Sequence, residues 1–193
     1  MRAALLLLSA LALAGCGESP AGNAAGADAA VENGVVAENA AMPAAETRGW
    51  DELFAKPASE ALAIFEKLSF QPGAYEIMGE SHMSHGAPIA LADTATDKAN
   101  VLTFNASGDA KQLQGVSFDV VIEDAAQAAA SRKRAIDSIV NALRAAGLAG
   151  EDVVTAALTA QAKPGTGSVA GANYAVTVKD SRTTITFTAK QST

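Results

Sequence analysis

Alternation of apolar and polar residues in the second half of the chain predicts several strands. Every second residue from Val116 to Ile122 is apolar, a period of two that is typical of a strand with one buried face. Asp180 and Ser181 separate two further apolar runs, which predicts a hairpin. Together with shorter runs earlier in the chain, the strands are expected at residues 74–78, 101–104, 116–122, 174–178 and 183–188.

Apolar residues three and four positions apart predict helices between these strands. The longest is expected at residues 125–146, with an apolar stripe that includes Ile139 and Leu143. Asp124 precedes it as a candidate N-cap, and Gly147 follows it where a C′ glycine is expected. Shorter helices are expected at residues 50–54, at residues 59–68 with Ser59 as N-cap, and at residues 151–162.

The order of these elements favours an α+β fold, because strands come in adjacent pairs and do not alternate regularly with helices. We expect a single domain over residues 49–193. Its sheet is expected to be antiparallel, with four or five strands and helices packed on one face. The other face would meet solvent or form a shallow groove.

The N-terminal quarter of the chain has a different composition. Alanine supplies 46 of the 193 residues, so much of the 49% hydrophobic content is methyl groups that do not by themselves build a core. Residues 17–48 contain eleven alanines, several glycines, two prolines and no aromatic residue. Such a segment cannot offset the entropy of ordering, and we expect residues 16–48 to be a disordered tether.

The first sixteen residues predict export. Arg2 is followed by a twelve-residue run that is apolar except for Ser9, which is too short to span a bilayer and has the order of a secretory signal. The run ends in Leu13-Ala14-Gly15-Cys16, and here the chain resembles the bacterial lipoprotein family, whose lipobox ends in a lipidated cysteine. The resemblance implies cleavage of residues 1–15 and acyl chains on Cys16. Because Gly17 and not Asp follows Cys16, it also favours the outer membrane, with the domain facing the periplasm.

An ordinary cleaved signal peptide with an incidental cysteine is the alternative interpretation of this segment. Two or more acyl chains would anchor the protein stably, whereas one would bind the membrane only marginally. The net charge of −7 disfavours electrostatic attraction to an anionic bilayer, so the lipid would have to hold the protein there. The same charge, together with the compartment, excludes nucleic acid as a partner.

Residues 78–85 hold the most suggestive side chains for chemistry. This segment contains both histidines and two of the four methionines. Thioether and imidazole ligands suit copper, and imidazole also suits zinc. The hypothesis is therefore a copper or zinc site at Met78, His82, Met83 and His85; the alternative is a polar loop after a strand.

Three other clusters have structural interpretations that outweigh functional ones. Glu123-Asp124 is expected to cap a helix in preference to acid–base catalysis. The glycine-rich residues 165–171 lack the features of a phosphate loop and are expected to form a mobile hairpin approach. Arg132-Lys133-Arg134 is expected on a solvated helix face, with contact to an anionic partner as the alternative.

The function expected from the sequence is non-enzymatic. No serine motif or activated nucleophile is recognisable beside His82 or His85, which makes a hydrolase the weakest of three hypotheses. We expect a lipid-anchored binding or accessory module, without a cofactor, for an envelope protein or a small ligand. The alternative function is periplasmic metal binding through the His82/His85 segment.

Overall fold

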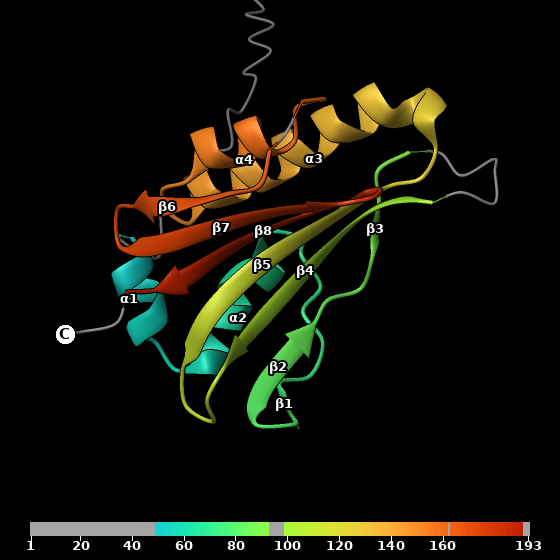
Figure 1. Cartoon of the computed structure of the whole chain (residues 1–193). Coiled ribbons are helices and arrows are strands. Elements are labelled where there is room, and N and C mark those ends of the chain that lie inside the picture. The colour runs from blue at the N-terminus through green and yellow to red at the C-terminus, as the bar shows by residue number, and fades with distance from the viewer. Residues whose placement is uncertain (1–48, 93–98, 162, 191–193) are drawn as a thin grey trace, which may run out of the picture. The chain divides into compact units, whose positions relative to one another are not determined.

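The computed structural model describes residues 49–92, 99–161 and 163–190, which form an α+β arrangement (Figure 1). Within these residues, four α-helices and a short 3-10 helix accompany one antiparallel sheet of eight strands. The predicted α+β class is confirmed. The cleaved signal predicted for residues 1–15 and the tether predicted for residues 16–48 lie outside the described part of the chain.

The helices occur close to where the apolar spacing predicts them, except that the helix predicted for residues 151–162 already ends at Ala157. Asp124 caps the 3-10 turn that leads into the long helix, since its Oδ1 accepts a hydrogen bond from the Ala126 amide at 2.9 Å. Gly147 ends that helix with a φ of 69°, as expected of a C′ glycine. The bounds are Trp50–Ala55 for α1, Ala58–Lys67 for α2, Ala125–Gln127 for η1, Ala128–Ala145 for α3 and Glu151–Ala157 for α4.

The prediction that Ser59 caps α2 is wrong. The N-cap is Pro57, whose carbonyl accepts hydrogen bonds from the amides of Glu60 and Ala61, both at 3.0 Å. Proline suits this place because it has no amide hydrogen to satisfy and its φ is already fixed. No helix in residues 49–92, 99–161 or 163–190 is long and apolar enough to cross a membrane.

The expectation of four or five strands is wrong, because the sheet has eight. The strands lie in the order β1-β2-β4-β5-β8-β7-β6, with β3 beside β4. The additional strands β2, β3 and β6 have no apolar alternation of their own and are held by backbone pairing with a neighbour. The bounds are Glu76–Met78 (β1), Ser81–His85 (β2), Ile89–Ala90 (β3), Asn100–Gly108 (β4), Leu113–Ile122 (β5), Gly165–Val169 (β6), Ala172–Lys179 (β7) and Arg182–Ala189 (β8).

Strand β6 corrects the interpretation of residues 165–171 as a loop. It pairs with β7, and Gly167 lies opposite Tyr174. A Cβ on Gly167 would lie only 2.6 Å from the Tyr174 hydroxyl, so glycine at this position makes room for the tyrosine ring. Gly167 therefore allows close packing against Tyr174 at the edge of the sheet, and residues 165–169 are a paired strand and not a mobile loop.

The core lies on one face of the sheet, which we call the covered face. Trp50 of α1 stacks on Phe187 of β8 with ring centroids 4.6 Å apart, and its Nε1 donates to the Ala149 carbonyl at 2.7 Å. Phe65 of α2 contacts Phe104 and Phe118 at the middle of the sheet. Helix α3 contacts β4 and β5, and α4 contacts β8. The opposite, open face carries the intervening residues of the same strands.

Candidate binding groove

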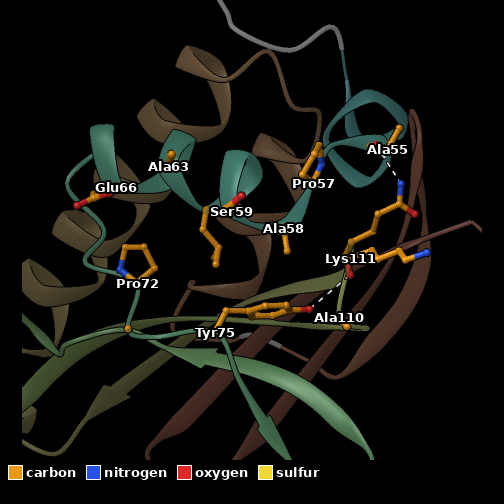
Figure 2. Close-up of a pocket in the computed structure, with 13 residues that line it drawn as sticks. Ala55, Pro57, Ala58, Ser59, Ala63, Glu66, Pro72, Tyr75, Ala110 and Lys111 are labelled. Carbon is orange, nitrogen blue, oxygen red and sulfur yellow. Dashed lines mark hydrogen bonds between the residues drawn. The ribbon is translucent and has the colours of Figure 1, made fainter.

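A groove of about 910 Å³ lies on the helix side of the sheet, beside α2 (Figure 2). Helix α2 forms one wall with Ala58, Leu62 and Ala63, and the segment from Pro72 to Tyr75 forms the floor. This volume falls within the range of about 300–1,000 Å³ that is typical of ligand sites. The groove is therefore large enough to hold a small ligand or a short segment of another protein.

The β4–β5 loop, residues 109–112, closes one end of the groove. The Asp109 carboxylate accepts hydrogen bonds from the amides of Lys111 at 2.7 Å and Gln112 at 2.9 Å. These bonds curl the loop into an Asx-type turn. They also stabilise the ionised form, so the pKa of Asp109 lies below its usual value, with smaller contributions from Gln114 and the Lys111 charge. The loop therefore keeps a defined shape.

The same loop is tied to the junction between α1 and α2. The Ala58 amide donates to the Lys111 carbonyl at 2.8 Å, and Gln112 Nε2 donates to the Ala55 carbonyl at 3.0 Å. Pro57 and Gln112 also form an isolated β-bridge. Residues more than fifty positions apart in the sequence thus form one continuous wall.

Tyr75 forms part of the groove floor. Its hydroxyl donates to the Asp109 carbonyl at 2.9 Å, with a longer contact of 3.4 Å to the Gln112 carbonyl. Partial burial raises the pKa of Tyr75 above its ordinary value, and the nearby Asp109 charge adds to the rise. A Cβ on Gly108 would lie 2.8 Å from this hydroxyl, so a glycine at the end of β4 lets the tyrosine approach.

The segment before β1 is held flat against β2. The Gly73 amide donates to the His85 carbonyl at 3.1 Å, and Ser84 Oγ donates to the Gly73 carbonyl at 2.8 Å. A Cβ on Gly73 would lie 2.4 Å from the His85 oxygen, which only glycine avoids. The floor of the groove is therefore positioned by backbone contacts as well as by side chains.

Charges of opposite sign flank the apolar part of the groove. Glu66 lies toward the C-terminal end of α2, and Lys111 lies on the far side of Tyr75 (Figure 2). Both side chains are exposed. Chemically, the groove offers apolar contact along Leu62 and Tyr75 and one charge of each sign at its ends.

No protein-family model, curated protein or solved structure matches this chain.

The four residues of the metal hypothesis are not brought to one side of the sheet. Strand pairing places Met78, Met83 and His85 on the open face, whereas His82 points to the other side, where its ring lies 5.6 Å from that of Tyr75. Among the described residues, no group of three or more His, Cys, Asp or Glu side chains is placed to hold a metal ion. Cys16, the predicted lipidation site, lies outside the described residues.

The alternative interpretation of residues 78–85 as a loop is also wrong in part, because Ser81–His85 is strand β2. The capping prediction for Glu123-Asp124 is confirmed for Asp124. In the basic cluster, Lys133 forms an exposed ion pair with Asp137 at 2.6 Å, as expected of a solvated helix face.

The local sequence pattern does not predict the groove. Its two boundaries contain residues that are typical of turns, Pro72-Gly73 and Gly108-Asp109. The signal that could have pointed to it is the pair of glycines in these turns, Gly73 and Gly108, each next to a close backbone approach. Which turns meet across the fold depends on strand order, and that order is not visible in the local pattern.

Proposed function

We propose that this chain is an envelope lipoprotein, anchored by lipid on Cys16 and facing the periplasm, whose domain is a non-enzymatic binding module. The lipobox resemblance supports the anchor, and the acidic composition leaves lipid as the means of attachment. The groove beside α2 is the observation that carries the binding role. It combines an apolar centre, a defined shape and two flanking charges.

The occupant we propose for the groove is a short segment of another envelope protein. An apolar residue of that segment would contact Leu62 and Tyr75, with a basic side chain toward Glu66 and an acidic one toward Lys111. Opposite charges across an interface mainly set the orientation and the association rate. A groove with an apolar centre, charged ends and an open side suits an extended segment better than a small apolar molecule that needs full enclosure.

A tether of residues 16–48 would raise the local concentration of the domain for partners on the same membrane. A flexible chain of this length has a root-mean-square reach of about 30 Å. Its fully extended span is about 110 Å. The groove could then meet a partner close to the bilayer without a high intrinsic affinity.

Site-specific photocrosslinking in cells tests the groove. A benzophenone side chain at Ala63, inside the groove, should give a discrete adduct with an envelope protein, whereas the same group at the exposed Ala130 of α3 should not. Lys111→Glu should reduce the adduct, because it places a second negative charge at the groove. The matched change Lys133→Glu, on the outer face of α3, should leave it unchanged. Equal adducts at both positions, or none at Ala63, would show that the groove is not the binding surface.

The anchor is tested separately by labelling cells with palmitate. Cys16→Ala should abolish both the label and membrane fractionation, because the predicted site of acylation is removed. A variant that stays in the membrane fraction without label would disprove anchoring through Cys16. This result would leave the crosslinking test of the groove intact.

A further inference from the structure

A chain of hydrogen bonds crosses the open face of the sheet from β2 to β8. His85 Nδ1 lies 2.9 Å from Asn105 Oδ1, and Asn105 Nδ2 donates to Asp119 Oδ2 at 3.0 Å. Thr184 Oγ1 donates to the other carboxylate oxygen of Asp119. Four neighbouring strands each contribute one residue, and the chain of bonds ends on the imidazole of an exposed histidine.

The direction of these bonds determines which nitrogen of His85 carries the hydrogen. An ionised carboxylate only accepts hydrogen bonds, so the amide nitrogen of Asn105 must face Asp119. The amide oxygen of Asn105 therefore faces His85, and Nδ1 of the imidazole must donate to it. In the neutral ring, the lone pair is then on Nε2, which points away from Asn105. A histidine that binds a metal is oriented in this way, by a hydrogen bond from its other nitrogen.

One thioether lies next to this imidazole on the same face. Met83 and His85 are two positions apart along β2, so their side chains point to the same side of the sheet. Met83 also lines a small hollow of about 50 Å³ together with Asn105, the residue that orients His85. Met78 of β1 lies opposite Ser81, about 13 Å along the strand from His85, and is too far away to share an ion with it.

We propose that Met83 and His85 form a binding site for Cu(I). A thioether is a soft ligand that selects Cu(I), and a neutral imidazole supplies the second ligand. The site would lie on the face opposite the groove and adds a metal-binding role to the proposed binding module. Asn105 acts as a positioning residue, and His82 takes no part because it lies on the other side of β2.

Competition titration with a coloured Cu(I) chelator tests this site on the full chain. All variants carry Cys16→Ser, so that a free thiol cannot bind the metal. One Cu(I) per chain is expected. His85→Ala should weaken binding by at least about 100-fold, since loss of an outer-shell partner alone typically costs about 10–100-fold. Met83→Leu should also weaken it by at least about tenfold.

Matched variants make the assignment specific. His82→Ala and Met42→Leu remove the same kinds of side chain elsewhere and should change the affinity by less than about twofold. Equal losses from His82→Ala and His85→Ala would overturn the proposal, as would the absence of saturable binding. Zn(II) binding as tight as that of Cu(I) would also overturn it, because it would show that the Met83 thioether does not contribute.

The positioning role of Asn105 has its own measurement. The chain has only two histidines, so their imidazole nitrogens can be distinguished by NMR with the His82→Ala variant. His85 should show the Nδ1–H tautomer without metal, and Asn105→Ala should give a mixture of tautomers and a lower Cu(I) affinity. A retained tautomer and an unchanged affinity in Asn105→Ala would exclude this role.

Discussion

The two faces of the sheet are built by the same strands and differ in almost every property. On the covered face, Phe104, Phe118 and Phe187 are at most 1% exposed and meet the helices. On the open face, the same three strands carry Asn105, Asp119 and Thr184. Asp119 accepts hydrogen bonds from the other two side chains. The alternation of a strand thus lets one element hold the domain together and present polar chemistry at the same time.

Two adjacent residues of β5 show most directly how much each face contributes to the free energy of unfolding. Phe118 is fully buried against Phe65, Phe70 and Phe104, so Phe118→Ala should lower the free energy of unfolding by about 3–5 kcal/mol. Ser117, its neighbour on the open face, should change it by no more than about 0.5 kcal/mol when replaced by Ala. Urea denaturation followed by circular dichroism measures both.

The comparison would fail if the two variants had similar unfolding free energies. A large loss from Ser117→Ala would mean that the open face is covered in the intact protein. A small loss from Phe118→Ala would mean that the aromatic cluster repacks around the space left by the ring.

Two asparagines of β4 test whether a polar group on the covered face is structural. Asn100 is 1% exposed; its side-chain oxygen accepts from the amides of Glu123 and Asp124, and its nitrogen donates to Ser131 Oγ at 2.8 Å. Asn100→Ala leaves these buried groups without partners and should cost about 1–3 kcal/mol.

Asn105→Ala, on the open face, should lower the free energy of unfolding by about 1 kcal/mol or less, because its partners can form hydrogen bonds with water instead. Thermal unfolding of the two variants side by side measures the difference. Equal costs would show that hydrogen bonding on the open face contributes to stability as much as the buried anchor does. Asn105 would then be part of the scaffold and not mainly a positioning residue.

Much of the covered face could be predicted from the sequence, because its pattern is local. The alternation from Val116 to Ile122 identified β5, and the spacing of Ile139 and Leu143 identified the long helix. Strand β2 could not be predicted in this way, because Ser81–His85 has only one apolar residue. Its place in the sheet depends on pairing with β1 and β4. Backbone pairing with neighbouring strands can form a strand from a segment whose own preference for strand is weak.

The groove and the site at His85 could not be predicted from local patterns for the same reason, because their residues are far apart in the sequence. His85 and Asn105 are twenty residues apart, and Asp119 and Thr184 are sixty-five apart. Gln112 and Ala55, which close the groove, are fifty-seven apart. Residues 78–85 drew attention by composition alone, and only the strand register separates His82 from His85.

Tyr75 gives the smallest expected effect and lies where the covered face reaches solvent. Tyr75→Phe removes the hydrogen bond to the Asp109 carbonyl and should cost about 1 kcal/mol at neutral pH. Because the pKa of Tyr75 is raised above 10.0 in the folded protein, the fold binds the phenolic proton more tightly than the unfolded chain does. The resulting contribution to stability is complete below pH 10 and is lost as the pH rises through the folded pKa.

Absorbance at 295 nm during an alkaline titration measures this ionisation. The wild-type chain should show one more ionisation above pH 10 than Tyr75→Phe does. The chain has two tyrosines, and the matched variant Tyr174→Phe should keep this ionisation. The stability difference between the wild-type chain and Tyr75→Phe should narrow over the same pH range, because only the tyrosine must ionise. Ionisation of Tyr75 at or below pH 10 would mean that water reaches the hydroxyl freely. The groove floor at Tyr75 would then be as accessible to solvent as the open face of the sheet.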